Sequence, residues 1–182
     1  MALEDYSLGN ITMQKDDKLI TEEDLEKIWN KLTNLITPPD IEKACFNAIE
    51  TLEKTILKLV NLNIESGFLK EKDAYLLGQN TAEVLSQFSR MSFMIGLEYG
   101  SKDKNSIRSD DFVAENAKKA LPLIKIASEP LQKAFIDLIG CLLVSKVITY
   151  EESQLVSQDS GKIILNSFIQ CFRLGLNYSS KI

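Results

Sequence analysis

The most informative absence in this sequence is histidine, which does not occur in any of the 182 residues. Without histidine there is no Ser-His-Asp or Cys-His catalytic arrangement, no HExxH motif and no histidine-ligated zinc. The phosphate-binding pattern GxxxxGK[ST] and the dinucleotide pattern GxGxxG are also missing. We therefore predict a protein that is not an enzyme and that binds no cofactor and no metal.

Long apolar runs and disulfide patterns are lacking too. The longest apolar run, Leu138–Val144, is far too short to cross a bilayer. The opening residues, MALEDYSLGN, do not place a basic region before an apolar one, so no secretory signal is predicted. The three cysteines, Cys45, Cys141 and Cys171, form no CxxC pair and lie within apolar helical patterns. We expect reduced core thiols and a cytoplasmic location.

Positive charge is scarce. The net charge is −5, and the acidic excess lies in residues 1–53, which hold 12 acidic against 5 basic residues. This balance disfavours a broad nucleic-acid surface. The acidic region is either a solvated face or a surface for a basic protein partner. Seven scattered cations leave weak phosphate binding as a minor alternative: Arg90, Lys102, Lys104, Arg108, Lys118, Lys119 and Lys125.

Apolar residues recur with the helical period and strand-like alternation is absent, so the chain is predicted to be all-α. Residues 1–20 show no periodicity and are expected to form a flexible arm before a single helical domain, 21–182. The first predicted helix begins after Thr21 and ends before Pro38. Its apolar stripe is Leu25, Ile28, Trp29, Leu32, Leu35 and Ile36. Trp29 is either a core residue or an exposed anchor for a partner.

Helix start and stop signals divide the rest of the domain. The predicted elements are a helix from Asp40 to about Gly67, a helical stretch from about 70 to 101 with a break near 78–81, a linker at 101–110, a helix at 111–127 that Pro122 kinks or restarts, a helix that opens near Pro130, and a last helix that begins with a capping box at Thr149–Glu152.

The chain also resembles itself at an offset of 79 residues. Leu52–Lys102 aligns with Leu131–Lys181 without a gap, and 12 of these 51 positions are identical. One hairpin cannot bury its apolar face alone, but two can bury it against each other. We therefore predict a helical bundle made by tandem duplication with pseudo-twofold symmetry: repeat 1 spans about 41–102, repeat 2 spans about 111–182, and the helices at 22–36 and 111–127 cover the flanks.

Small residues recur every four positions near the end of each repeat. Ser92, Gly96 and Gly100 correspond to Cys171, Gly175 and Ser179. A glycine within a helix costs about 1 kcal/mol relative to alanine, so its presence in both copies indicates close approach of two backbones. We predict that the two repeat-ending helices cross near Gly96 and Gly175, with Phe93 and Phe172 beside the crossing. Alternatively, the small residues form an external groove that receives a second chain.

Two pairs of polar residues are candidates for contact with a ligand or partner. Gln79 and Gln158 occupy equivalent positions, as do Tyr99 and Tyr178. They could line a small-ligand pocket on the pseudo-twofold axis, or they could serve helix ends and surface packing. Acidic pairs such as Glu151-Glu152 lie at predicted helix starts, where the helix dipole explains them without a metal.

The function that these features favour is protein–protein interaction. We expect a cytoplasmic adaptor, regulator or inhibitor that binds another protein, or a second copy of itself as a homodimer, through its helical faces. A small-ligand-binding bundle is the alternative, and weak nucleic-acid binding is a third, less favoured one. The chain carries no motif that identifies the partner.

Overall fold

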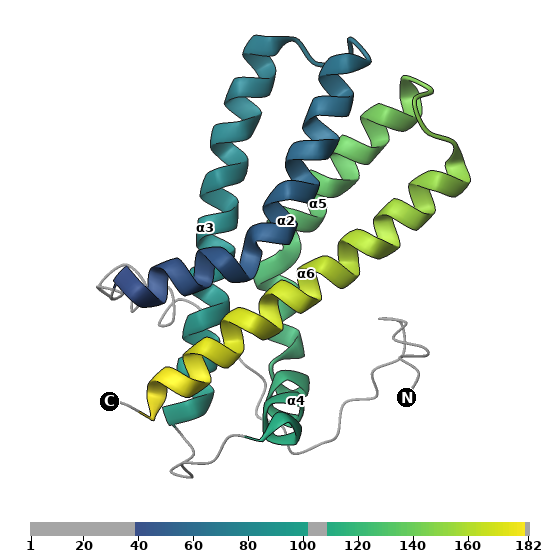
Figure 1. Cartoon of the computed structure of the whole chain (residues 1–182). Helices are drawn as coiled ribbons and strands as arrows, with labels where there is room; N and C mark the ends of the chain where they lie inside the picture. Colours follow the sequence, from purple (N-terminus) through teal and green to yellow (C-terminus); the bar gives the residue numbers. More distant parts are fainter. Residues whose placement is uncertain (1–38, 102–108, 181–182) are drawn as a thin grey trace.

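The computed structural model describes residues 39–101 and 109–180, and within this part the only regular elements are helices. The all-α prediction is therefore confirmed for the described residues (Figure 1). The helices are α2 (Pro39–Glu65), α3 (Glu71–Ser101), α4 (Asp110–Lys119), α5 (Leu121–Val144) and α6 (Tyr150–Ser179). The predicted arm 1–20, the helix 22–36 with Trp29, and the linker residues 102–108 lie outside the described residues.

Four of the helices form two antiparallel hairpins, α2–α3 and α5–α6 (Figure 1). The two hairpin turns lie at the same end of the molecule, and α3 and α6 cross toward the opposite end (Figure 1). The contact between α3 and α6 is the most extensive between any two described helices. The short helix α4 leads into α5 and packs against α5 and α6.

The buried face of α2 and that of α5 are spaced alike along the sequence. Every residue of α2 that is buried has a buried residue of α5 79 positions later. The α2 set is Cys45, Ile49, Leu52, Ile56, Leu59, Val60 and Asn63, and the α5 set is Ile124, Ser128, Leu131, Phe135, Leu138, Ile139 and Leu142. Both sets follow the three- and four-residue steps of an amphipathic helix, which is why the period was readable in the sequence.

The turns that close the two hairpins have the same hydrogen bonds. Gly67 has φ +74° and donates its N–H to the Ile64 carbonyl, while Phe68 donates to the Asn63 carbonyl. In the second hairpin Lys146 has φ 58° and donates to the Leu143 carbonyl. The left-handed residue after the helix satisfies carbonyls that have no partner within the helix. The predicted left-handed conformation of Gly67 is confirmed.

Because lysine occupies the left-handed position of the second turn, this turn is the more strained of the two. We expect Lys146→Gly to raise the free energy of unfolding by about 0.5–1 kcal/mol, since a non-glycine residue in this conformation costs roughly 1–2 kcal/mol and glycine loses part of that gain in backbone entropy. Urea denaturation of the full chain measures the effect. The matched change, Gly67→Lys, should lower the free energy of unfolding by a similar amount. Equal stabilities of all three proteins would contradict this prediction.

The capping box before α6 is confirmed. The Thr149 hydroxyl accepts the Glu152 N–H at 3.2 Å, and the Glu152 carboxylate accepts the Thr149 N–H at 2.8 Å. These hydrogen bonds lower the pKa of the Glu152 carboxyl, because they favour its charged form. Ser109 caps α4 in the related way by accepting the Phe112 N–H.

Three sequence predictions of helix boundaries need correction. The helix is not broken at 78–81, because α3 runs from Glu71 to Ser101, and α5 begins at Leu121 and continues through Pro130 instead of opening there. Pro130 is exposed, and it frees the carbonyl of Ile126, which is itself 45% exposed, so water can satisfy that carbonyl. Asp40 is the second residue of α2, inside its first turn. The restart at Pro122 is confirmed, because Ala120 separates α4 from α5.

Candidate interaction surface

The repeat-ending helices meet at their glycines. A Cβ atom on Gly96 would lie 2.8 Å from the carbonyl carbon of Phe172 and closer still to its oxygen. A Cβ atom on Gly175 would lie 2.7 Å from the Leu97 nitrogen and closer still to the Phe93 oxygen. The structure thus brings together the four residues that the sequence proposed for the crossing, and each glycine contacts the backbone of the other helix.

Aromatic side chains fill the space beside the crossing. The rings of Phe93 and Tyr178 lie 5.9 Å apart, and those of Tyr99 and Phe172 are also 5.9 Å apart. Both phenylalanines are at most 2% exposed and both glycines are buried. The alternative in which these glycines form an external groove is therefore wrong, because the opposing helix occupies the position that a docked chain would take.

The two glutamines do not join the two tyrosines. Gln79 and Gln158 are exposed, whereas Tyr99 and Tyr178 are half-buried at the crossing. Because α3 and α6 are unbroken, each glutamine is 20 residues from the tyrosine of its own helix, or about 30 Å along the axis. The prediction of one small pocket lined by all four side chains is therefore wrong. A groove of 430 Å³ lies instead on α2, lined by Lys54, Leu57, Lys58, Asn61, Leu62 and Glu65.

Two of the three cysteines meet between α2 and α6. All three thiols are free, and Cys45 and Cys171 are buried. The Cys171 thiol donates to the Cys45 carbonyl at 3.8 Å. Its hydrogen bond with the Cys45 thiol, together with burial, raises the pKa of Cys171 far above the ordinary thiol value. This cysteine stays protonated and is a poor nucleophile, as expected for a core residue.

Asn63 is the polar residue that contacts the second hairpin most directly. Its side chain is fully buried, and its amide nitrogen donates to the Leu59 carbonyl at 2.8 Å and to the Leu138 carbonyl at 3.2 Å. Its oxygen has no hydrogen-bond partner among the described residues. The position 79 residues later is Leu142, which is also fully buried. The polar side chain is therefore tolerated in a place where an apolar one fits.

We expect Asn63→Leu to raise the free energy of unfolding by about 1 kcal/mol, because an unsatisfied buried oxygen costs about 1–3 kcal/mol and leucine removes it. Chemical denaturation measures the change, with Asn61→Leu, an exposed position on the same helix, as the control. A loss of stability in Asn63→Leu alone would show that the side-chain oxygen has a partner, such as a buried water molecule.

The charged residues that could carry chemistry do not converge. Among the described residues, no three Cys, Asp or Glu side chains are placed to hold a metal ion. Asp110 and Asp111 lie in the first turn of α4, and Asp110 forms an ion pair with Arg173 of α6. Of the seven cations considered for phosphate binding, Arg90 pairs with Glu42 and Lys119 with Glu115. The carboxylates thus serve helix starts and surface ion pairs.

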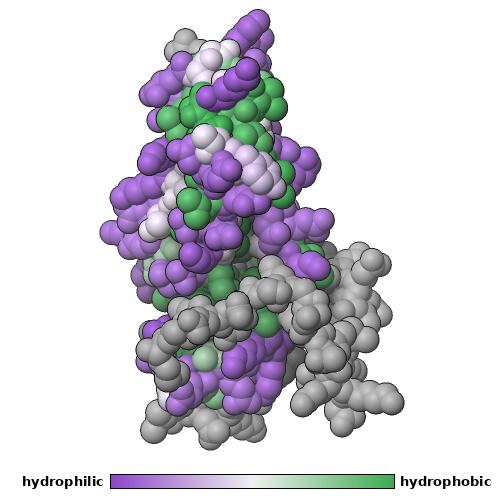
Figure 2. Space-filling view, turned by 90° about the vertical axis from the view of Figure 1, so that its right-hand side faces the viewer, coloured by the Kyte–Doolittle hydropathy of each residue, from purple (hydrophilic) through white to green (hydrophobic). Residues whose placement is uncertain are grey.

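Exposed apolar side chains gather at the end of the α5–α6 hairpin. Ten large apolar residues of the described part are exposed, and half of them fall between positions 136 and 155: Ile136, Val144, Val147, Tyr150 and Leu155. Figure 2 shows this apolar surface toward the upper end of the molecule, on the side where α6 begins. We call these five residues the α5–α6 apolar end. Single exposed apolar residues are ordinary on a monomer, whereas a group of them indicates a contact surface.

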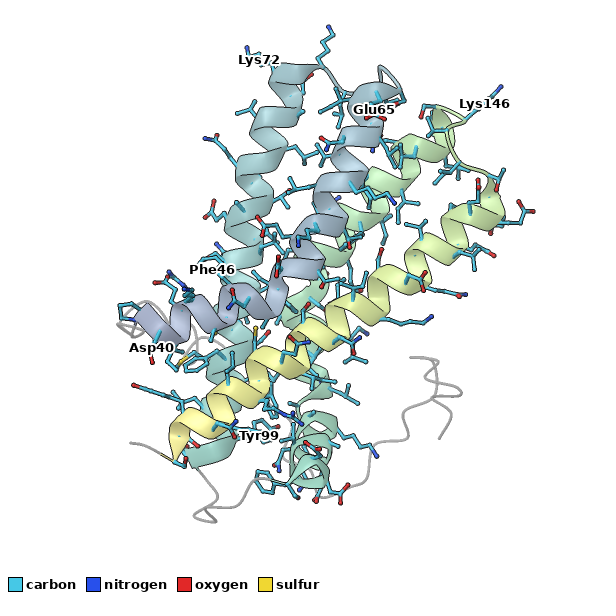
Figure 3. All side chains as sticks on the ribbon, viewed as in Figure 1. Asp40, Phe46, Glu65, Lys72, Tyr99 and Lys146 are labelled. Carbon is cyan, nitrogen blue, oxygen red and sulfur yellow. The ribbon has the colours of Figure 1, made fainter. Side chains whose placement is uncertain are left out.

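The corresponding end of the α2–α3 hairpin is more polar. Val144 and Tyr150 are 72% and 62% exposed, and the residues 79 positions earlier are Glu65 and Glu71. Figure 3 shows Glu65 and Lys146 at the adjacent ends of the two hairpins. Sequence reasoning missed this surface, although the replacement of two glutamates by valine and tyrosine in the aligned repeats was a signal that could have found it.

No known family is identified for this chain. No family model, curated protein or solved structure matches its sequence or fold. Of the helices that the structure describes, none combines the length and the apolar character that a membrane crossing requires. The argument for function therefore depends on the surface itself.

Proposed function

We propose that this chain is a non-enzymatic protein–protein interaction module of the cytoplasm, an adaptor, regulator or inhibitor that binds its partner through the α5–α6 apolar end. The observation that carries the proposal is the exposure of Val144 and Tyr150 at positions where the other hairpin has glutamates. Exposed valine and tyrosine beside a turn are typical of binding surfaces, and tyrosine is enriched at binding hot spots. The three free thiols agree with a reducing compartment.

We also propose that the bundle arose by tandem duplication and has pseudo-twofold symmetry. The supporting observations are reciprocal. Helices α5 and α6 end and begin 79 residues after α2 and α3 do, and the two turns share their hydrogen bonds. Gly96 contacts Phe172 as Gly175 contacts Phe93, and Phe93 pairs with Tyr178 as Tyr99 pairs with Phe172.

Duplication gives the proposed function a physical origin. Two equivalent hairpins fold onto each other through their crossing helices, so both outer ends are left free of the shared core (Figure 1). One end then retained charged residues and the other acquired apolar ones. A surface that contributes nothing to the core can change in this way with little loss of stability.

The test returns the apolar end to the residues of its counterpart. The double variant Val144→Glu and Tyr150→Glu is compared with wild type and with Leu76→Glu, whose residue is 52% exposed on the other hairpin. Each full chain is used to capture proteins from native lysate, with circular dichroism to establish that the fold is intact. We expect wild type and Leu76→Glu to retain the same protein and the double variant to lose it.

Light scattering on the three purified proteins separates a foreign partner from a second copy. If the wild type is a dimer and the double variant a monomer, the partner is the chain itself. If all three capture the same proteins and have the same mass in solution, the α5–α6 apolar end is not the binding surface and the proposal fails.

A further inference from the structure

We propose that the amphipathic segment 21–36 of this chain packs on the outward face of α3 around Met91 and Met94, in the position that α4 takes on α6. Residues 21–36 lie outside the described part, and the inference depends on their sequence and on the surface that the structure describes. It identifies a second interaction surface, distinct from the α5–α6 apolar end, together with its occupant.

The outward face of α3 is defined by its spacing from the crossing. Met94 is two residues from both Ser92 and Gly96, so it points away from the crossing with α6. Its neighbours one turn away on the same stripe are Arg90, which is exposed, and Glu98, which is half-buried. Met94 is only 6% exposed, so this face already carries an apolar side chain that is shielded from water.

The equivalent face of α6 is polar, and α4 lies beside it. The residues 79 positions after Met91, Met94 and Glu98 are Gln170, Arg173 and Asn177, and all three are exposed. Asp110 at the start of α4 forms an ion pair with Arg173, and α4 buries Val113 and Ala117. A polar helix with a small apolar face thus accompanies a polar surface.

The segment before α2 has the chemistry that the surface on α3 lacks in α6. Its apolar stripe has six large residues, Leu25, Ile28, Trp29, Leu32, Leu35 and Ile36. Methionines form adaptable apolar surfaces that accept aromatic residues. The more apolar segment is therefore matched with the more apolar of the two helix faces.

The path of the chain allows this contact. Glu42 in the first turn of α2 forms an ion pair with Arg90 of α3 at 3.0 Å, so α2 begins one helical turn from Met94. Figure 3 shows Asp40 at this end of α2, near the crossing region that contains Tyr99. A helix of 16 residues spans about 24 Å, and the stretch of α3 from residue 87 to 101 spans about 21 Å. Thr37 and Pro38 then suffice as the connection.

Trp29 is the single tryptophan of the chain, so its fluorescence reports on this contact directly. In the full-length wild type we expect emission typical of a buried indole and weak quenching by acrylamide. In Met94→Arg, which installs the residue found at the α6 position, we expect emission and quenching to become those of the urea-unfolded chain, with helical content unchanged. The control is Leu76→Arg, an exposed apolar position elsewhere on α3, which should behave as wild type.

A second variant tests the same contact from the other side, in case Met94→Arg does not fold. Trp29→Glu should leave the bundle folded and increase the rate at which hydrogen peroxide oxidises Met94 to the sulfoxide, measured by mass spectrometry. Wild-type emission equal to that of the unfolded chain, or an unchanged Met94 oxidation rate in Trp29→Glu, would overturn the inference. So would a Trp29 signal that changes with protein concentration, because the segment would then bind a second copy. These measurements need no external partner, so they are independent of the proposed function.

Discussion

Alanine at Gly96 or at Gly175 is expected to lower the free energy of unfolding by about 3 kcal/mol or more, because overpacking at a rigid site exceeds the usual cost of an extra methyl group. The added Cβ would meet backbone atoms of Phe172 or of Phe93 and Leu97, and backbone cannot rotate away as a side chain can. The helices α3 and α6 would have to separate, and the aromatic pairs beside the crossing would separate with them.

Thermal and urea unfolding of Gly96→Ala and Gly175→Ala measure this effect, and the same helices supply the control. A Cβ on Gly161 of α6 would have no atom within 4 Å, and the equivalent position in α3 is Ala82. We expect Gly161→Ala to raise the free energy of unfolding by about 1 kcal/mol through helix propensity. If Gly96→Ala is as stable as wild type, the two helices do not cross at this point.

Truncation of Phe172 is the second change with a large expected effect. This side chain is fully buried, its ring is stacked on Phe168 with centroids 5.5 Å apart, and it meets the edge of Tyr99. Phe172→Ala should lower the free energy of unfolding by about 3–5 kcal/mol, since it removes apolar contacts and leaves a cavity that two packed helices cannot close.

Phe46→Ala is the matched control, because Phe46 is 49% exposed on α2 and its removal leaves no cavity. We expect a change of less than about 1 kcal/mol for this variant. Phe93→Ala should resemble Phe172→Ala, because Phe93 is 2% exposed and packs on Tyr178. A small effect at Phe172 with a large one at Phe93 would show that the two halves of the crossing do not bear equal shares of the stability.

The two hairpin turns illustrate where local sequence is sufficient. Gly67 permits the left-handed conformation, and the Thr149 and Glu152 side chains satisfy the first backbone groups of α6. These interactions lie within a few residues of one another, so no knowledge of the distant chain is needed to predict them. The crossing was also readable, since glycine in a helix needs a compensating contact and it recurs in both aligned repeats.

The errors arise where packing overrides local preference. Gly78, Gln79 and Asn80 are weak helix formers and suggested a break, yet α3 continues because Ala74, Thr81 and Leu85 on the same helix are buried. The pocket predicted from the glutamines and tyrosines depended on that break. Once the helix is continuous, the two residue pairs lie at distant levels of the bundle and cannot meet.

The sequence by itself determined the helical class, the hairpin turns, the helix caps and the glycine positions, because periodicity and backbone chemistry act over short distances. Tertiary structure alone decided which side chains are exposed. It buried both glycines against opposing backbone, separated Gln79 from Tyr99, and left the α5–α6 apolar end open to solvent. The physical reason is that exposure depends on which other segments cover a residue, and those segments lie far from it along the chain.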